Sequence, residues 1–182
     1  MELPSVEEMT SLHTLAKNVD YTLRVHGAKS VLIVSDYEGE GKSTFLKSCA
    51  PVISELYEKK ILIFDCQDDE KSSAELSELL STPRLSYVRE SELTFLNTLP
   101  PSEKISSLAA YFYELCKSYD IVFVNMKTSR RAEKTVFPYV PLDGAIIVRS
   151  KKSVGKMDKH VTEELRDREI PILGLVYNEG AL

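Results

Sequence analysis

The sequence has few cysteines, no long apolar run and no excess of positive charge. Its three cysteines, Cys49, Cys66 and Cys116, are an odd number at wide spacings, which excludes a disulfide-stapled miniprotein and predicts reduced thiols. No run approaches the roughly 18 apolar residues that cross a bilayer. The opening MELPSVEEMTS lacks the basic and apolar regions of a signal peptide. We therefore expect a cytoplasmic protein.

The charge balance and the length narrow the class further. The 23 Lys and Arg residues face 28 Asp and Glu residues, for a formal net charge of −5. Nonspecific nucleic-acid binding needs an excess of positive charge, so we expect no nucleic-acid partner. The 182 residues, of which 43% are hydrophobic and 28% charged, fit one folded domain spanning 1–182.

Short apolar runs alternate with helix-length segments along the chain. The runs lie at 31–34, 61–64, 85–88, 121–124, 145–148 and 172–177. Runs that are apolar on both faces are typical of strands covered on both sides, and their alternation with helices predicts βαβ crossovers. Helices are expected from a capping box at Ser5 and Glu8, and over 42–58, 72–81, 102–118 and 153–168. The fold class is therefore α/β, a three-layer sandwich with a mostly parallel central sheet.

The segment VLIVSDYEGEGKSTFLKS runs from an apolar strand directly into a helix through residues 39–44. Glycines let successive backbone N–H groups turn inward around an anion, and the helix adds its positive N-terminal end. Lys42 can reach the β- and γ-phosphates, and the Ser43 hydroxyl can ligate Mg²⁺. The pattern indicates a phosphate-binding (P-loop) site. The alternative is an ordinary strand-to-helix turn with a solvated lysine.

Two further strand ends are expected beside this loop, because ligands of such sheets bind at the carboxyl ends of strands. Asp65 follows one strand and could orient a Mg²⁺ ligand or a substrate hydroxyl, although an acid that merely terminates a strand is the alternative. Asn125 follows another strand and brings no negative charge to a metal. The loop itself is acidic, and Asp36 stands where the usual pattern has its first glycine.

The order and wording of these segments resemble the bacterial tyrosine kinases of capsule and exopolysaccharide synthesis, within the MinD/ParA-like class of phosphate-loop ATPases. The resemblance covers nearly the whole chain. It begins at a helix that opens with Glu7-Glu8 and continues through the GEGKST loop, the Asp65 strand end, LSELLS at 76–81, residues 99–103, YDIVFV at 119–124 and LDGAIIV at 142–148 to ILGLVYN at 172–178. It implies a P-loop NTPase-like fold that binds ATP or ADP with Mg²⁺. The residues it implies for the phosphates and the metal are Gly39, Glu40, Gly41, Lys42, Ser43 and Thr44.

The resemblance also implies roles for residues outside the loop. Lys42 and Asp65 would be catalytic, Ser43 and Asp65 would hold the metal, and Asn178 would lie near the adenine. The partner would be a protein of polysaccharide synthesis or export, with membrane association through that partner and homodimerisation left open.

The sequence departs from the family pattern in the motifs that carry catalysis and assembly. Gln67 replaces the second acid after Asp65, Asn125 replaces an acid of the third motif, and Ser11 and Thr14 replace two arginines of an assembly motif. No tyrosine-rich tail follows Asn178 in this sequence. We therefore expect a degenerate member that does not transfer phosphate.

Three functions remain open at this point. The first is a nucleotide-binding partner or regulator without turnover. The second is an active ATPase or tyrosine autokinase that uses Lys42, Ser43 and Asp65, and the third is a nucleotide-free scaffold. Basic residues also follow two strands and could offset the acidic loop, receive an anionic partner or form a solvated surface: Lys127, Arg130, Arg131, Lys134, Arg149, Lys151, Lys152, Lys156 and Lys159.

Overall fold

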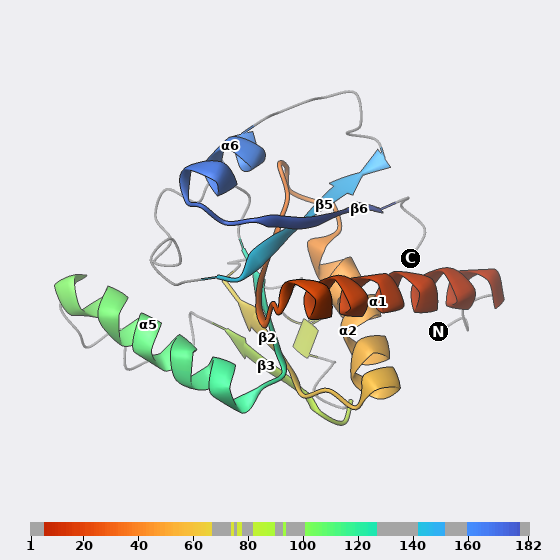
Figure 1. Ribbon diagram of the computed structural model, residues 1–182, viewed down its shortest axis with the longest axis horizontal. Helices are drawn as coiled ribbons and strands as arrows, with labels where there is room; N and C mark the ends of the chain where they lie inside the picture. Colours follow the sequence, from red (N-terminus) through yellow and green to blue (C-terminus); the bar gives the residue numbers. More distant parts are fainter. Residues whose placement is uncertain are drawn as a thin grey trace.

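The computed structural model describes residues 6–66, 74, 76–77, 82–89, 93, 101–126, 142–151 and 160–178. Figure 1 shows helices arranged around a twisted central sheet. The helices described are α1 (Val6–His26), α2 (Lys42–Tyr57), α5 (Pro101–Ser118) and α6 (His160–Asp167). The strands are β1 (Ser30–Val34), β2 (Ile61–Asp65), β3 (Leu85–Arg89), β4 (Ile121–Asn125), β5 (Gly144–Ser150) and β6 (Ile172–Asn178).

The strands form a six-stranded sheet in the order β3-β2-β4-β1-β5-β6. Every strand pair in it is parallel, which confirms the predicted parallel sheet. β1 lies between β4 and β5, so the carboxyl ends of these three strands lie side by side at one edge of the sheet. The predicted phosphate-binding loop leaves β1 at the centre of that edge.

Each face of the sheet has its own apolar core, which makes the molecule three-layered. On one face α1 and α2 cover Val31, Ile33 and Ile63, and on the other α5 and α6 cover Leu32 and Val34. Alternate residues of one strand thus enter opposite cores, which is why the runs read as apolar throughout. The predicted three-layer sandwich is confirmed.

Some expected elements fall outside the described residues. These are Ser5 of the capping box, most of the helix expected over 72–81, and the first part of the helix expected over 153–168. The described part of that last helix, α6, begins at His160. No helix within the described ranges has the length and hydropathy that crossing a membrane requires.

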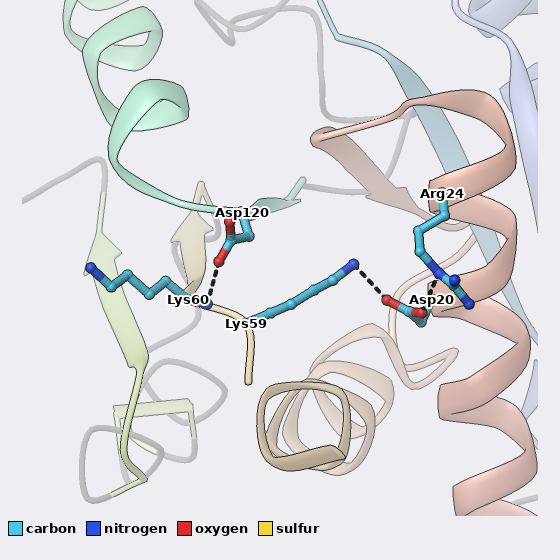
Figure 2. A network of polar contacts seen from close by, with 5 residues as sticks. All are labelled: Asp20, Arg24, Lys59, Lys60 and Asp120. Carbon is cyan, nitrogen blue, oxygen red and sulfur yellow. Dashed lines mark hydrogen bonds and ion pairs between the residues drawn. The ribbon is translucent and has the colours of Figure 1, made fainter. Parts of the chain in front are cut away.

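Polar contacts hold the amino-terminal edge of the sheet, opposite the loop (Figure 2). Asp20 of α1 is fully buried and accepts hydrogen bonds from Lys59 Nζ at 2.6 Å and Arg24 Nε at 2.8 Å. The backbone N–H of Lys60 donates to Asp120 Oδ2 at 2.8 Å. Because Lys59 and Lys60 directly precede β2, these contacts fix the entry of β2 against α1 and against the start of β4.

Candidate functional site

The loop between β1 and α2 depends on glycine at two positions. Gly39 has φ of 74° and Gly41 has φ of 98°, both in the left-handed region that side chains disfavour. A Cβ on Gly39 would meet open space, whereas a Cβ on Gly41 would overlap the side chain of Asn178. Gly41 is therefore required both by its backbone conformation and by the close approach of the end of β6.

Lys42, the first residue of α2, is held inside the loop. Its side chain is buried, and Nζ donates a hydrogen bond to Ser35 Oγ at 2.8 Å. Ser35 Oγ in turn donates to the carbonyl oxygen of Tyr37 at 2.7 Å. Burial lowers the pKa of Lys42 from 10.5 to about 8, although the charges of Glu40, Glu38 and Asp65 act in the opposite direction. Lys42 is thus a partly desolvated cation, the kind of group that gains most from an arriving anion.

Asp36, at the position of the missing first glycine, forms an ion pair across the sheet edge. Its Oδ2 accepts a hydrogen bond from Arg149 Nε at 2.9 Å, and Arg149 Nη2 lies 2.8 Å from the same oxygen in the ion pair. The Asp36 side chain is 3% exposed and that of Arg149 is 20% exposed. A cation at the end of β5 therefore offsets the acid that the loop carries in place of glycine, which is one of the roles left open for the basic residues near the loop.

Of the other predicted basic residues, Lys151 lies in the part of the chain that the structure describes. It is exposed and directly follows β5. The remaining ones, Lys127, Arg130, Arg131, Lys134, Lys152, Lys156 and Lys159, lie outside the described residues, as does Gln67. Among these basic residues, Arg149 is therefore one that the structure shows paired with an acid of the loop.

Asp65 lies at the carboxyl end of β2 and is 1% exposed. Its Oδ1 accepts a hydrogen bond from Asn125 Nδ2 at 3.0 Å, and its Oδ2 accepts one from Tyr87 Oη at 2.7 Å. Asn125 pairs with Asp65 in the register of β2 and β4, so the expected meeting of these two strand ends is confirmed. Both carboxylate oxygens of Asp65 are thus engaged by neutral donors.

Tyr87 is a site residue that sequence reasoning misses. It lies in the middle of β3, and the run LSYV reads only as an apolar strand. Its hydroxyl is the one signal in the sequence, because a half-buried tyrosine hydroxyl needs a polar partner. The partner becomes known only once β3 is placed beside β2.

Asn178 ends β6 and lies against the loop, where its Nδ2 donates to the carbonyl oxygen of Glu40 at 3.3 Å. Ser43 and Thr44 follow Lys42 in the first turn of α2, and both are half-buried. The fold thus brings loop residues 39–44, Asp65 and Asn178 to one edge of the sheet.

The donors at this edge suit Mg²⁺ only in part. Mg²⁺ prefers oxygen ligands and is commonly held by one or two carboxylates together with substrate phosphates. The Ser43 hydroxyl and the Asp65 carboxylate have the right chemistry, and the hydrogen bonds from Tyr87 and Asn125 occupy one lone pair on each oxygen of Asp65. Within the described ranges, no group of three or more His, Cys, Asp or Glu side chains is placed to hold a metal ion.

Comparisons with known proteins identify the class of fold. No protein-family model matches the chain, and no curated protein matches it. Solved structures do match. The chimerical protein CapA2B2 matches with TM-score 0.68 and 18% identity over 97% of this chain and 87% of that one. The BceF tyrosine kinase domain matches with TM-score 0.66 and 21% identity over 94% of this chain and 77% of that one. The kinase domain of Escherichia coli tyrosine kinase ETK matches with TM-score 0.64 and 14% identity over 94% of this chain and 75% of that one.

A solved structure with a bound nucleotide also matches the fold at a lower TM-score. FlhF complexed with GMPPNP and Mg²⁺ matches with TM-score 0.51 and 17% identity over 82% of this chain and 55% of its own. At these identities the likeness is one of fold. The chain therefore has the P-loop NTPase fold, as predicted, in the form seen in bacterial tyrosine kinase domains.

Proposed function

We propose that this protein is a degenerate relative of the bacterial tyrosine kinases that binds ATP or ADP through its loop and does not transfer phosphate. The single observation that carries the proposal is the hydrogen bonding of the Asp65 carboxylate. Its oxygens accept hydrogen bonds from Asn125 and Tyr87, where phosphoryl transfer would need a carboxylate directed at a metal shell.

The site supplies little of the charge that the transition state of phosphoryl transfer requires. Phosphoryl transfer is accelerated almost entirely by positioning and by charges placed against the transferring group, so a neutral amide at Asn125 removes one such charge. Each carboxylate oxygen has two lone pairs, but the hydrogen bonds from Asn125 and Tyr87 fix the orientation of the Asp65 carboxylate, and a metal that required it to rotate would break at least one of them. Leaving a buried donor such as the Asn125 amide without its partner costs on the order of 1–3 kcal/mol. Both effects work against turnover and leave phosphate binding intact.

Nucleotide binding is supported by the loop itself. Gly39 and Gly41 have the positive φ values with which such loops turn backbone N–H groups toward an anion, and Lys42 and the start of α2 would add positive charge. The Asp36 charge, which would oppose phosphate, is offset by Arg149. Ser43 and Thr44 would bind the phosphates and Mg²⁺, and Asn178 would lie on the adenine side.

One observation favours an active kinase as the second candidate. Tyr87 Oη donates a hydrogen bond to Asp65 Oδ2, and a carboxylate that accepts a tyrosine proton is what a base for tyrosine phosphorylation must be. In this alternative Lys42, Ser43 and Asp65 would carry the reaction. Mass spectrometry after incubation with ATP and Mg²⁺ distinguishes the two, because phosphotyrosine that disappears in Asp65→Asn would establish the active enzyme.

We further propose, on the family resemblance, that the partner is a protein of polysaccharide synthesis or export. A membrane-bound partner would bring the protein to the membrane, and a homodimer is compatible with the same role. Affinity capture with a polysaccharide-system membrane protein, compared between the wild type and Lys42→Ala, tests whether nucleotide regulates that contact.

Calorimetric titration with ATP and Mg²⁺ tests the proposal directly. The wild type should bind with saturation, and Lys42→Ala should lose binding by about 100-fold or more, because a charge-assisted contact to phosphate is removed. Lys47→Ala, on the same helix but beyond its first turn, is the matched control and should bind like the wild type. Absence of saturable binding in the wild type would favour the nucleotide-free scaffold.

A further inference from the structure

Glu40 is a buried acid within the loop that should receive phosphate. It lies between Gly39 and Gly41 and is only 3% exposed. Its Oε2 accepts a hydrogen bond from the backbone N–H of Tyr37 at 3.0 Å. Its Oε1 is buried and has no hydrogen-bond partner within the described part of the chain. A carboxylate that accepts a backbone N–H of this loop makes the kind of contact that a phosphate oxygen makes.

The two buried acids of the loop differ in how their charge is compensated. The guanidinium of Arg149 is paired with Asp36, whereas no ion pair joins Glu40 to a cation among the described residues. Lys42, the cation of the loop, donates a hydrogen bond to Ser35 and not to Glu40. A buried carboxylate with one free oxygen is costly, so a simple turn would be better served by a neutral acceptor at this position.

Glu40 also acts on Lys42 through space. Among the charges that favour the protonated form of Lys42, that of Glu40 has the largest effect. Glu40 therefore interacts with two groups of the kind that a phosphate would contact. It accepts a hydrogen bond from a backbone N–H of the loop, and its charge favours the protonated ammonium of Lys42. In a loop without nucleotide, this arrangement supplies an anion from the chain itself.

We propose that the Glu40 carboxylate takes the place of an anion in the loop and that nucleotide binds by displacing it. The inference rests on the proposed function, because it requires that the loop bind a nucleotide. The consequence is self-inhibition: part of the binding free energy of the nucleotide is spent on releasing Glu40. Affinity is then set by how firmly Glu40 is held.

Three variants separate the contact from the charge. Glu40→Ala removes both, Glu40→Gln removes the charge but keeps an oxygen that can accept the Tyr37 N–H, and Glu38→Gln removes one charge from an exposed position of the same loop. Calorimetric titration with ATP and Mg²⁺ should show about five- to tenfold tighter binding for Glu40→Ala, the factor expected for the net contribution of one hydrogen bond. The affinity of Glu40→Gln should lie between those of Glu40→Ala and the wild type, and Glu38→Gln should change affinity by less than about twofold.

The outcomes are distinct from those of the proposed function. Binding that is unchanged or weaker in Glu40→Ala would overturn the displacement of Glu40 while leaving nucleotide binding in place. An equal gain in Glu38→Gln would reduce the effect to loop charge and would also overturn it. Failure of the wild type and all three variants to bind would overturn the proposed function and the inference together. A cooperative thermal unfolding transition in each variant would verify that it is folded.

Discussion

Replacing Lys42 with methionine removes the charge of the loop lysine while keeping a long unbranched side chain. The pKa of Lys42 falls from 10.5 to about 8 because of burial, so the folded state holds its proton less tightly than the unfolded chain does. Each tenfold change in that equilibrium is worth about 1.4 kcal/mol, so at neutral pH the buried ammonium costs the fold on the order of 3 kcal/mol. Methionine avoids this cost.

The net gain is smaller than the full cost. The substitution also removes the hydrogen bond from Lys42 Nζ to Ser35 Oγ, whose loss offsets about 1 kcal/mol. Ser35 keeps its own bond to the Tyr37 carbonyl, so no buried hydroxyl proton is left without an acceptor. We expect Lys42→Met to raise the free energy of unfolding at pH 7 by about 1–3 kcal/mol while abolishing nucleotide binding.

The pH dependence gives the sign of the effect. Below pH 8 the lysine is charged in both states, and the burial cost is present in full. As the pH rises from 8 toward 10.5, the folded state loses the proton before the unfolded chain does, so the wild type gains stability relative to the variant. The advantage of Lys42→Met should therefore shrink by about 1 kcal/mol between pH 7 and pH 9.

Urea unfolding followed by far-ultraviolet circular dichroism measures the effect at both pH values. Lys47→Met, at a half-buried position of the same helix, is the control and should change stability by less than about 0.5 kcal/mol. The prediction is wrong if Lys42→Met is less stable than the wild type at pH 7, or if its gain in the free energy of unfolding does not shrink at pH 9. Either result would mean that the buried ammonium of Lys42 does not destabilise the fold.

Other predictions concern the supports of the loop and of the opposite edge. Gly41→Ala should lose nucleotide binding and about 2 kcal/mol of stability, whereas Gly39→Ala, which meets open space, should lose about 1 kcal/mol, by urea unfolding and calorimetry. Arg149→Met leaves a buried carboxylate unpaired and should cost about 2–4 kcal/mol; an unchanged midpoint would exclude the pairing. Asp20→Ala should lower the free energy of unfolding by only about 2 kcal/mol, because the cations that it leaves unpaired still reach water. Glu114→Ala removes an exposed ion pair and should leave the urea midpoint unchanged.

The sequence was sufficient for the strands and for the edge at which the site lies. Runs such as 31–34 are apolar on both faces because both faces are covered, and the same rule holds for 61–64 and 121–124. Since parallel strands end at one edge, Asp65 and Asn125 could be expected near the loop before the register was known.

The contacts within the site could not be predicted in this way. The partners Asp36 and Arg149 are 113 positions apart, and nothing in either local sequence selects the other. Tyr87 reaches Asp65 only because β3 pairs with β2 rather than lying elsewhere in the sheet. The burial of Lys42 likewise results from the packing of the loop and not from its motif. Pairings between distant elements depend on the tertiary fold, which local patterns do not specify.

The central claim is that the loop holds nucleotide while Asp65, bonded to Tyr87 and Asn125, does not support phosphoryl transfer. The most direct test incubates the purified protein with stoichiometric radiolabelled ATP and Mg²⁺, then analyses the bound nucleotide and the protein. We expect the label to be recovered as protein-bound, intact ATP. Conversion of the ATP to ADP with the γ-phosphate released to solution, or transferred to a tyrosine, would contradict the claim.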